Sequence, residues 1–144
     1  VQTCALPISG ADIPWIFDVE GESGFRVREA KMIDQLSMMD NIVLATGGGA
    51  VTSEENRANL KDRGTVVYLK APIRQQVERT SRDKNRPLLQ TPDPEKTIRE
   101  LMEIREPLYA EVADFSVDTF RRNPRSVSQE ILRHLNELSG DQSL

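Results

Sequence analysis

Short apolar runs alternate with helix-like segments along most of this chain, and this alternation limits the folds open to it. Three runs have the length and composition of strands buried on both faces: residues 42–45 (Ile-Val-Leu-Ala), 65–69 (Thr-Val-Val-Tyr-Leu) and 115–118 (Phe-Ser-Val-Asp). Strands that alternate with helices predict an α/β fold with a mainly parallel sheet.

Capping residues and turn formers set the limits of the expected helices. Ser53 is a suitable N-cap, and Gly64 ends the helix that follows it. Pro107 falls inside a helical pattern, so that helix is expected to bend or to end there. The expected helices span residues 12–17, 22–39, 54–61, 72–82, 95–112 and 125–138.

Charge and composition exclude several classes of protein. Nineteen basic residues stand against 23 acidic ones, for a net charge of −4, which argues against a general nucleic-acid binder. No apolar run approaches the ~20 residues of a membrane-spanning helix. A single cysteine excludes a disulfide framework and a structural zinc site, and a single histidine, His134, argues against a histidine-centred triad or metal cluster. We therefore expect one soluble cytoplasmic domain without nucleic-acid or membrane partners.

Residues 1–9 (VQTCALPIS) differ in character from the rest. The first eight match the translation of GTT CAG ACG TGT GCT CTT CCG ATC, part of a common sequencing-adapter oligonucleotide. We interpret them as a non-native segment, in which case Cys4 has no biological role and the natural chain begins further upstream. The alternative is a natural N-terminal strand or tail. The expected domain spans residues 10–138, and residues 139–144 form a loose tail.

A glycine triplet, Gly47–Gly49, directly follows the first apolar run. Ligands of parallel α/β sheets bind outside the carboxyl ends of the strands. Glycine lets the backbone approach a ligand closely and leaves N–H groups free for anions or hydroxyls. A tight strand-to-helix turn without a ligand is the alternative, and a glycine triplet taken alone favours it.

Two arginine sites have the chemistry to hold an anion. Arg26 and Glu29 are three residues apart on one helical face, where the carboxylate can orient the guanidinium group. Arg105 precedes Pro107, near the expected bend. The alternative is an ordinary solvated helix surface, and each arrangement taken singly favours it.

Basic residues also gather in two loops. The Pro-rich segment 83–94 contains Arg86 and suits a lid that closes over phosphates. Arg122 lies in a basic turn after the last apolar run, where a guanidinium group could stack on a base. A solubilising surface loop is the alternative for both.

The motifs GFR, IVLATGGG, VVYL, RDKNRPLL, REPLY and VDTFRRNP, in this order and spacing, resemble the shikimate kinase family over about residues 10–138. The resemblance implies a parallel-sheet phosphate-loop kinase fold like that of the nucleoside monophosphate kinases. It also implies transfer of the γ-phosphate of ATP to the 3-hydroxyl of shikimate, with Mg²⁺, by a monomeric enzyme of the chorismate pathway.

The same resemblance assigns roles to individual residues. It implies that Arg26 and Arg105 hold the shikimate carboxylate, with Glu29 supporting Arg26. The backbone of Gly47, Gly48 and Gly49, chiefly Gly48, would meet the ring hydroxyls.

The resemblance further implies two nucleotide contacts. Arg86, in the lid, would reach the ATP phosphates and stabilise the transition state, because phosphoryl transfer needs positive charge on the moving group. Arg122 would lie against the adenine.

The chain departs from the family pattern at its beginning. The family starts with a strand and the loop G-x-x-G-x-G-K-[ST], whose lysine and amides hold the phosphates, and its second strand ends in Asp-x-Asp, which helps to place Mg²⁺. Neither motif occurs here. We therefore expect a fold lacking its first strand, phosphate loop and second strand, with no metal ligands retained and no activity as it stands. The alternatives are a non-catalytic kinase-like binding module and a related small-molecule kinase such as gluconate kinase.

The missing central strand leads to an expectation about stability. In the family that strand lies between the strands matching residues 42–45 and 65–69. Each buried backbone group left unpaired costs about 1–3 kcal/mol, whereas whole domains are stable by only ~5–15 kcal/mol. The chain is therefore expected to be molten or prone to aggregation. Residues 1–9 could take the position of the missing central strand, although Pro7 has no backbone N–H to donate to a neighbouring strand.

Overall fold

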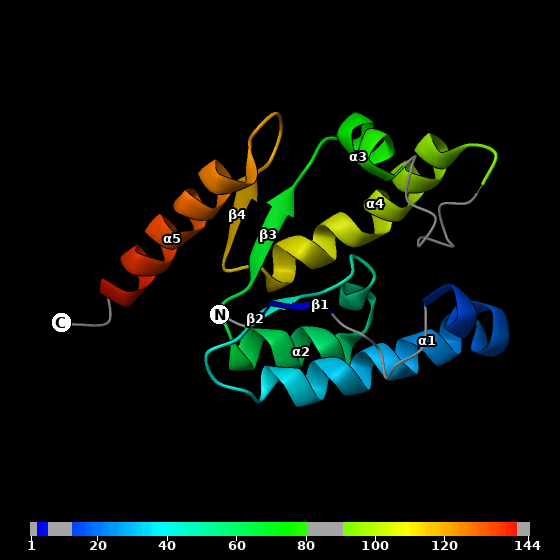
Figure 1. Ribbon diagram of the computed structural model, residues 1–144, viewed down its shortest axis with the longest axis horizontal. Coiled ribbons are helices and arrows are strands. Elements are labelled where there is room, and N and C mark those ends of the chain that lie inside the picture. Colours follow the sequence, from blue (N-terminus) through cyan, green and yellow to red (C-terminus); the bar gives the residue numbers. More distant parts are fainter. Residues whose placement is uncertain (1–2, 6–12, 81–90, 141–144) are drawn as a thin grey trace.

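Parallel strands and helices alternate through the protein (Figure 1), whose structure is a computed structural model that describes residues 3–5, 13–80 and 91–140. In chain order the elements are β1 (Thr3–Ala5), α1 (Ile13–Ser37), β2 (Val43–Ala45), the 3₁₀ turn η1 (Ala50–Thr52), α2 (Glu54–Arg63), β3 (Val67–Lys70), α3 (Ile73–Thr80), α4 (Pro94–Val112), β4 (Phe115–Asp118) and α5 (Pro124–Gly140). The expected α/β class is confirmed.

The described strands form two separate parallel pairs. β1 pairs with β2, placing Cys4 opposite Leu44, and β3 pairs with β4, placing Tyr68 opposite Ser116. No ladder joins β2 to β3 in the part of the chain that the structure describes. The parallel direction agrees with the prediction from the sequence, but the strands do not form one continuous sheet.

The strand β1 comes from the segment interpreted as non-native. The pattern along the chain indicated no strand ahead of the first helix, apart from the suggestion that residues 1–9 could fill a vacant slot. The structure instead pairs Thr3–Ala5 with β2 over three residues. An unpaired strand edge is a template for any extended segment, which explains this pairing physically.

Helix α1 consists of two helical stretches that meet at Gly21, where φ is +71°. Glycine adopts this left-handed conformation without steric cost. Phe17 and Phe25 pack across the bend, with ring centroids 4.8 Å apart, and Ile16 is completely buried beside them. The two helices expected at residues 12–17 and 22–39 are therefore joined by a kink.

Helix α4 continues through Pro107 to Val112, so the helix does not end at the proline. Proline removes the N–H that would bond the carbonyl of Glu103. Both Glu103 and Pro107 are exposed, so water can satisfy that carbonyl. The side chain of Asp93 caps the helix by accepting a hydrogen bond from the N–H of Lys96.

The helices hold the two strand pairs together. Figure 1 shows α1 and α2 side by side near β1 and β2, with α5 next to β4. The ring of Phe115 packs on His134 of α5 at 4.8 Å, and Val117 is completely buried. Helix α4 contacts η1, α2 and α3, so it connects the turn that follows β2 with the rest of the molecule.

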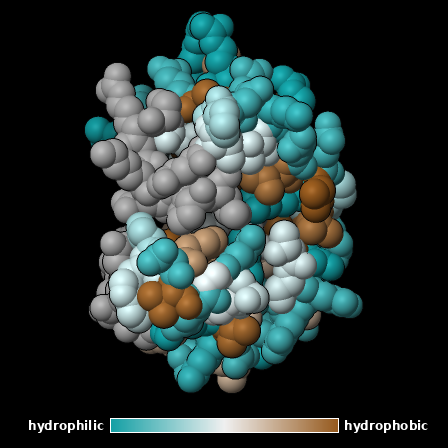
Figure 2. Space-filling model, turned by 90° about the vertical axis from the view of Figure 1, so that its right-hand side faces the viewer, coloured by the Kyte–Doolittle hydropathy of each residue, from teal (hydrophilic) through white to brown (hydrophobic). Residues whose placement is uncertain are grey.

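Several apolar side chains of the strands face solvent. Val43 in β2 is 55% exposed and Leu69 in β3 is 50% exposed. Figure 2, a view of one end of the molecule, shows hydrophobic residues in small separate groups among hydrophilic ones. None of the described helices has the length and apolarity needed to cross a bilayer.

We predict a broad, weakly cooperative thermal unfolding of the 144-residue chain, with aggregation, when it is followed by circular dichroism. Fully burying an aliphatic side chain stabilises a fold by about 1.5–3 kcal/mol, and Val43 and Leu69 gain only part of this. A sharp transition in a monomeric sample would contradict the prediction.

A matched pair of variants tests whether the exposed apolar side chains of the strands cause the aggregation. We expect Val43→Thr to leave the free energy of unfolding within about 0.5 kcal/mol and to reduce aggregation, because the side chain is exposed. Val117→Thr buries a hydroxyl group in the core and should abolish the folded signal.

Candidate functional site

The glycine turn Gly47–Gly49 connects β2 to η1 and forms a tight backbone bend. The N–H of Ala50 donates to the carbonyl of Gly47 at 3.1 Å, and the N–H of Thr52 donates to the carbonyl of Gly49 at 3.1 Å. Gly47 and Gly48 are exposed, whereas Gly49 is buried. The turn therefore offers backbone groups to solvent at one end of β2.

Side chains from α1 and α4 pack directly on this turn. A methyl group on Gly49 would lie 2.6 Å from Cζ of Arg26, and one on Gly48 would lie 2.8 Å from the hydroxyl oxygen of Tyr109. The same methyl group on Gly48 would lie 3.8 Å from Nη1 of Arg105. The absence of side chains at these glycines is what allows the approach.

Arg26 is held by a buried carboxylate. Its Nη1 donates to Oε2 of Glu29 at 2.6 Å, and its Nη2 donates to Oε1 of the exposed Glu22 at 3.1 Å. Glu29 is only 2% exposed and its Oε1 faces Gly47. A carboxylate buried this deeply requires a paired charge, so Glu29 and Arg26 fix each other beside the turn.

Arg105 and Tyr109 lie one turn apart on α4, on the same face of the helix. The hydroxyl of Tyr109 donates to the carbonyl of Gly48 at 2.7 Å. Burial raises the pKa of Tyr109, while the neighbouring Arg105 guanidinium acts in the opposite direction. No carboxylate in the described part of the chain forms an ion pair with Arg105, so its charge is available to an added anion.

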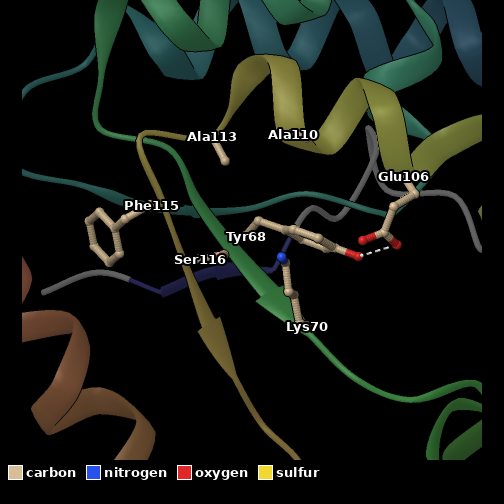
Figure 3. A pocket seen from close by; sticks show the side chains of 7 residues that line it. All are labelled: Tyr68, Lys70, Glu106, Ala110, Ala113, Phe115 and Ser116. Carbon is tan, nitrogen blue, oxygen red and sulfur yellow. Dashed lines mark hydrogen bonds between the residues drawn. The ribbon is translucent and has the colours of Figure 1, made fainter.

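Tyr68 of β3 packs against Tyr109 and so helps to fix its position. Its ring stacks on that of Tyr109, with centroids 4.6 Å apart and an interplanar angle of 25°. Its hydroxyl donates to Oε2 of Glu106 at 3.2 Å, as the dashed line in Figure 3 shows. Burial and the nearby Glu106 carboxylate raise the pKa of Tyr68.

A pocket of about 200 Å³ lies between α4 and the β3–β4 pair, and Figure 3 shows the side chains that line it. Lys70 and Glu106 reach into it, and its remaining walls are largely apolar. None of the residues that line the pocket belongs to the cluster formed by Arg26, Glu29 and Arg105.

The family resemblance implied one site formed by Arg26, Glu29, the glycine turn and Arg105, and the structure brings these groups together. Arg26 and Arg105 are 79 positions apart in the chain, yet both guanidinium groups face the turn. The expected convergence is therefore observed, although the contacts alone do not assign a ligand.

Of the two predicted nucleotide contacts, the structure describes only Arg122. Arg86 falls outside the described residues, as does most of the expected lid at 83–94. Arg122 follows β4 and is tied to α5: it pairs with Glu130, and its Nη2 donates to Oγ of Ser126 at 2.9 Å. It takes no part in the glycine-turn cluster.

The described residues offer no group of three or more histidine, cysteine, aspartate or glutamate side chains that could hold a metal ion.

Sequence reasoning did not single out Tyr109, which completes the cluster. The signal was present, because Tyr109 follows Arg105 by four residues and so shares its helix face. Asn56, a 1% exposed residue of α2, was also missed, although its amide donates to the carbonyl of Ala50 at 3.0 Å. Its position three residues after Ser53 indicates only that Asn56 lies in the first turn of a helix.

We predict that both tyrosines ionise above pH 10 in the folded chain, because burial disfavours the phenolate. In an absorbance titration at 295 nm, Tyr68→Phe and Tyr109→Phe leave one tyrosine each and assign the two steps. A raised folded-state pKa contributes stability below the unfolded value of about 10, and that stability is lost as pH rises through the folded value. The chain in urea should titrate near pH 10, and a folded chain that does the same would contradict the prediction.

Comparison with known proteins agrees with the geometry. A family model described as shikimate kinase matches residues 8–136. The shikimate kinase of Pseudomonas entomophila is 58% identical over 130 residues, which cover 90% of this chain and 76% of that protein.

Solved structures give the same result. The shikimate kinase from Acinetobacter baumannii in complex with shikimate is 50% identical, with a TM-score of 0.87 over 90% of this chain and 72% of that one. The shikimate kinase from Aquifex aeolicus is 38% identical, with a TM-score of 0.75 over 90% of this chain and 75% of that one. With this match in sequence and structure across most of its length, the chain belongs to the shikimate kinase family.

Proposed function

We propose that this chain carries the shikimate-binding side of a shikimate kinase active site, at the glycine turn. Members of the family are phosphotransferases that use ATP and Mg²⁺. The observation that carries the proposal is the approach of Arg26, Glu29 and Arg105 to Gly47–Gly49. The relative from Acinetobacter baumannii was solved with shikimate bound and has a TM-score of 0.87 to this chain.

The chemistry of the cluster suits a hydroxylated carboxylic acid. Arg26 and Arg105 would hold the carboxylate, because guanidinium groups bind carboxylates through paired charge-assisted hydrogen bonds. The buried Glu29 orients Arg26 and keeps its position fixed before the ligand arrives. The exposed N–H groups of Gly47 and Gly48 would meet ring oxygens at the surface of the turn.

Arg122 and Arg86 would form the nucleotide side of the site. Arg122 donates to Ser126 and pairs with Glu130 in the plane of its guanidinium group, and a plane held in this way could support an adenine ring. Arg86 would act from the lid. The sequence contains no G-x-x-G-x-G-K-[ST] loop, so we propose that these 144 residues bind shikimate without phosphorylating it.

Titration calorimetry with shikimate tests the binding proposal. We expect the unaltered chain to bind, and Arg105→Lys to weaken binding by about tenfold or more, which corresponds to ~1.4 kcal/mol. Lysine keeps the charge but loses the planar fork. The matched control is Arg99→Lys on the same helix, because Arg99 is exposed and pairs with Glu95 at the helix surface. Equal losses in both variants would contradict the assignment.

Gly49→Ala gives a second test of the same site. The added methyl group would overlap the Arg26 guanidinium, which is the flexible end of a side chain. We therefore expect the chain to stay folded but with lower stability, because Glu29 loses part of its pairing with Arg26, and we expect shikimate binding to fall at least tenfold. Unchanged affinity would show that the position of Arg26 does not matter.

Two further measurements separate the alternatives. Gluconate, which also carries a carboxylate and hydroxyls, should bind more weakly than shikimate, and tighter binding would favour a gluconate kinase-like specificity. A coupled ADP-release assay should show no shikimate-dependent turnover by this chain. Robust turnover would overturn the proposal of binding without phosphorylation.

A further inference from the structure

Side-chain donors hold four consecutive carbonyl groups at and after the glycine turn. Tyr109 donates to Gly48, and Thr52 Oγ1 donates to Gly49 at 2.8 Å. The next two carbonyls, of Ala50 and Val51, receive hydrogen bonds at 3.0 Å from Asn56 Nδ2 and at 2.8 Å from Arg57 Nη1. The orientation of this backbone is therefore set by side chains and not by the turn alone.

Holding a carbonyl also directs the following amide. In a trans peptide the C=O of one residue and the N–H of the next point in opposite directions within one plane. The hydrogen bond from Tyr109 to the Gly48 carbonyl thus fixes where the Gly49 N–H points. Within the described part of the chain, no residue accepts a hydrogen bond from the N–H of Gly47, Gly48 or Gly49.

Tyr109 differs from the other three donors in its origin. Thr52, Asn56 and Arg57 come from η1 and α2, which directly follow the turn, whereas Tyr109 reaches it from α4, 61 residues beyond Gly48. It also lies one helical turn from Arg105. A single hydroxyl therefore links the helix that presents Arg105 to the backbone that presents the amides.

The ring of Tyr109 is itself held in place. It stacks on Tyr68 at 4.6 Å, and Tyr68 in turn bonds to Glu106 of the same helix α4 (Figure 3). Stacked aromatic pairs prefer a limited set of geometries. The hydroxyl of Tyr109 thus has a fixed position from which to orient the turn.

We propose that Tyr109 is a positioning residue for shikimate, whose hydroxyl sets the spacing between Arg105 and the amides of the glycine turn. The inference rests on the proposed function for the identity of the ligand. If Tyr109 is a positioning residue, its hydroxyl affects shikimate affinity without contacting shikimate. A tyrosine that only packed would act through its ring, and phenylalanine would replace it fully.

The test compares Tyr109→Phe with Thr119→Val. Thr119 is 7% exposed and its hydroxyl also donates to a backbone carbonyl, that of Lys70 at 2.8 Å, but it follows β4 and bonds the last residue of β3, not the glycine turn. Both variants lose one hydroxyl-to-carbonyl hydrogen bond. The measurements are the ¹⁵N–¹H spectrum of the glycine amides and the shikimate Kd, taken in trimethylamine N-oxide, which favours compact states.

We expect Tyr109→Phe to shift the Gly49 amide resonance and to raise the shikimate Kd by about tenfold. We expect Thr119→Val to leave both within error while lowering the melting temperature by a similar amount. Equal Kd changes in the two variants would overturn the inference, because the effect would then be general destabilisation. An unmoved Gly49 resonance, or a shifted resonance with unchanged Kd, would also overturn it.

Two remaining outcomes separate this inference from the function on which it rests. If the unaltered chain does not bind shikimate, the proposed function fails together with the affinity effect, while the amide shifts still decide whether Tyr109 orients the turn. A chain without a dispersed spectrum in the osmolyte would overturn the inference, since no fixed turn would exist to be oriented.

Discussion

The ion pair between Arg26 and Glu29 underlies the arrangement of the site. Glu29 is buried, and a buried carboxylate is stable only with a partner, so Arg26 is kept beside the turn. Its guanidinium group occupies the space that a side chain at Gly49 would fill. Charge pairing in α1 and the missing Cβ in the turn therefore depend on each other.

Helix α4 places Arg105 and Tyr109 beside the glycine turn, next to Arg26 and Glu29 of α1. Arg105 and Tyr109 share one face of this helix, and the Tyr109 hydroxyl bonds to the carbonyl of Gly48. The helix keeps that position because it contacts η1, α2 and α3. The cluster is thus assembled around the turn after β2, and this can occur although β2 and β3 belong to separate strand pairs.

Local rules predicted much of the secondary structure. The run Phe115–Asp118 was predicted as a strand with the observed limits. The predicted N-cap at Ser53 is also confirmed, since its side chain accepts a hydrogen bond from the N–H of Asn56. Pro107 is the instructive exception. Proline disfavours a helix interior, but an exposed position in a helix held by tertiary contacts tolerates the lost hydrogen bond.

The sequence by itself determined which groups were available: alternating strands and helices, a glycine triplet after a strand, and arginines with carboxylates at helical spacing. These are local properties, fixed by periodicity and residue type. The packing of the helices in the tertiary structure brings Arg26 and Arg105 to one turn, as the family resemblance implied, and it also places Tyr109 on Gly48 and ties Arg122 to Glu130, which nothing in the sequence indicated. Such contacts join residues far apart in the chain, and they depend on how helices pack, which no local pattern specifies.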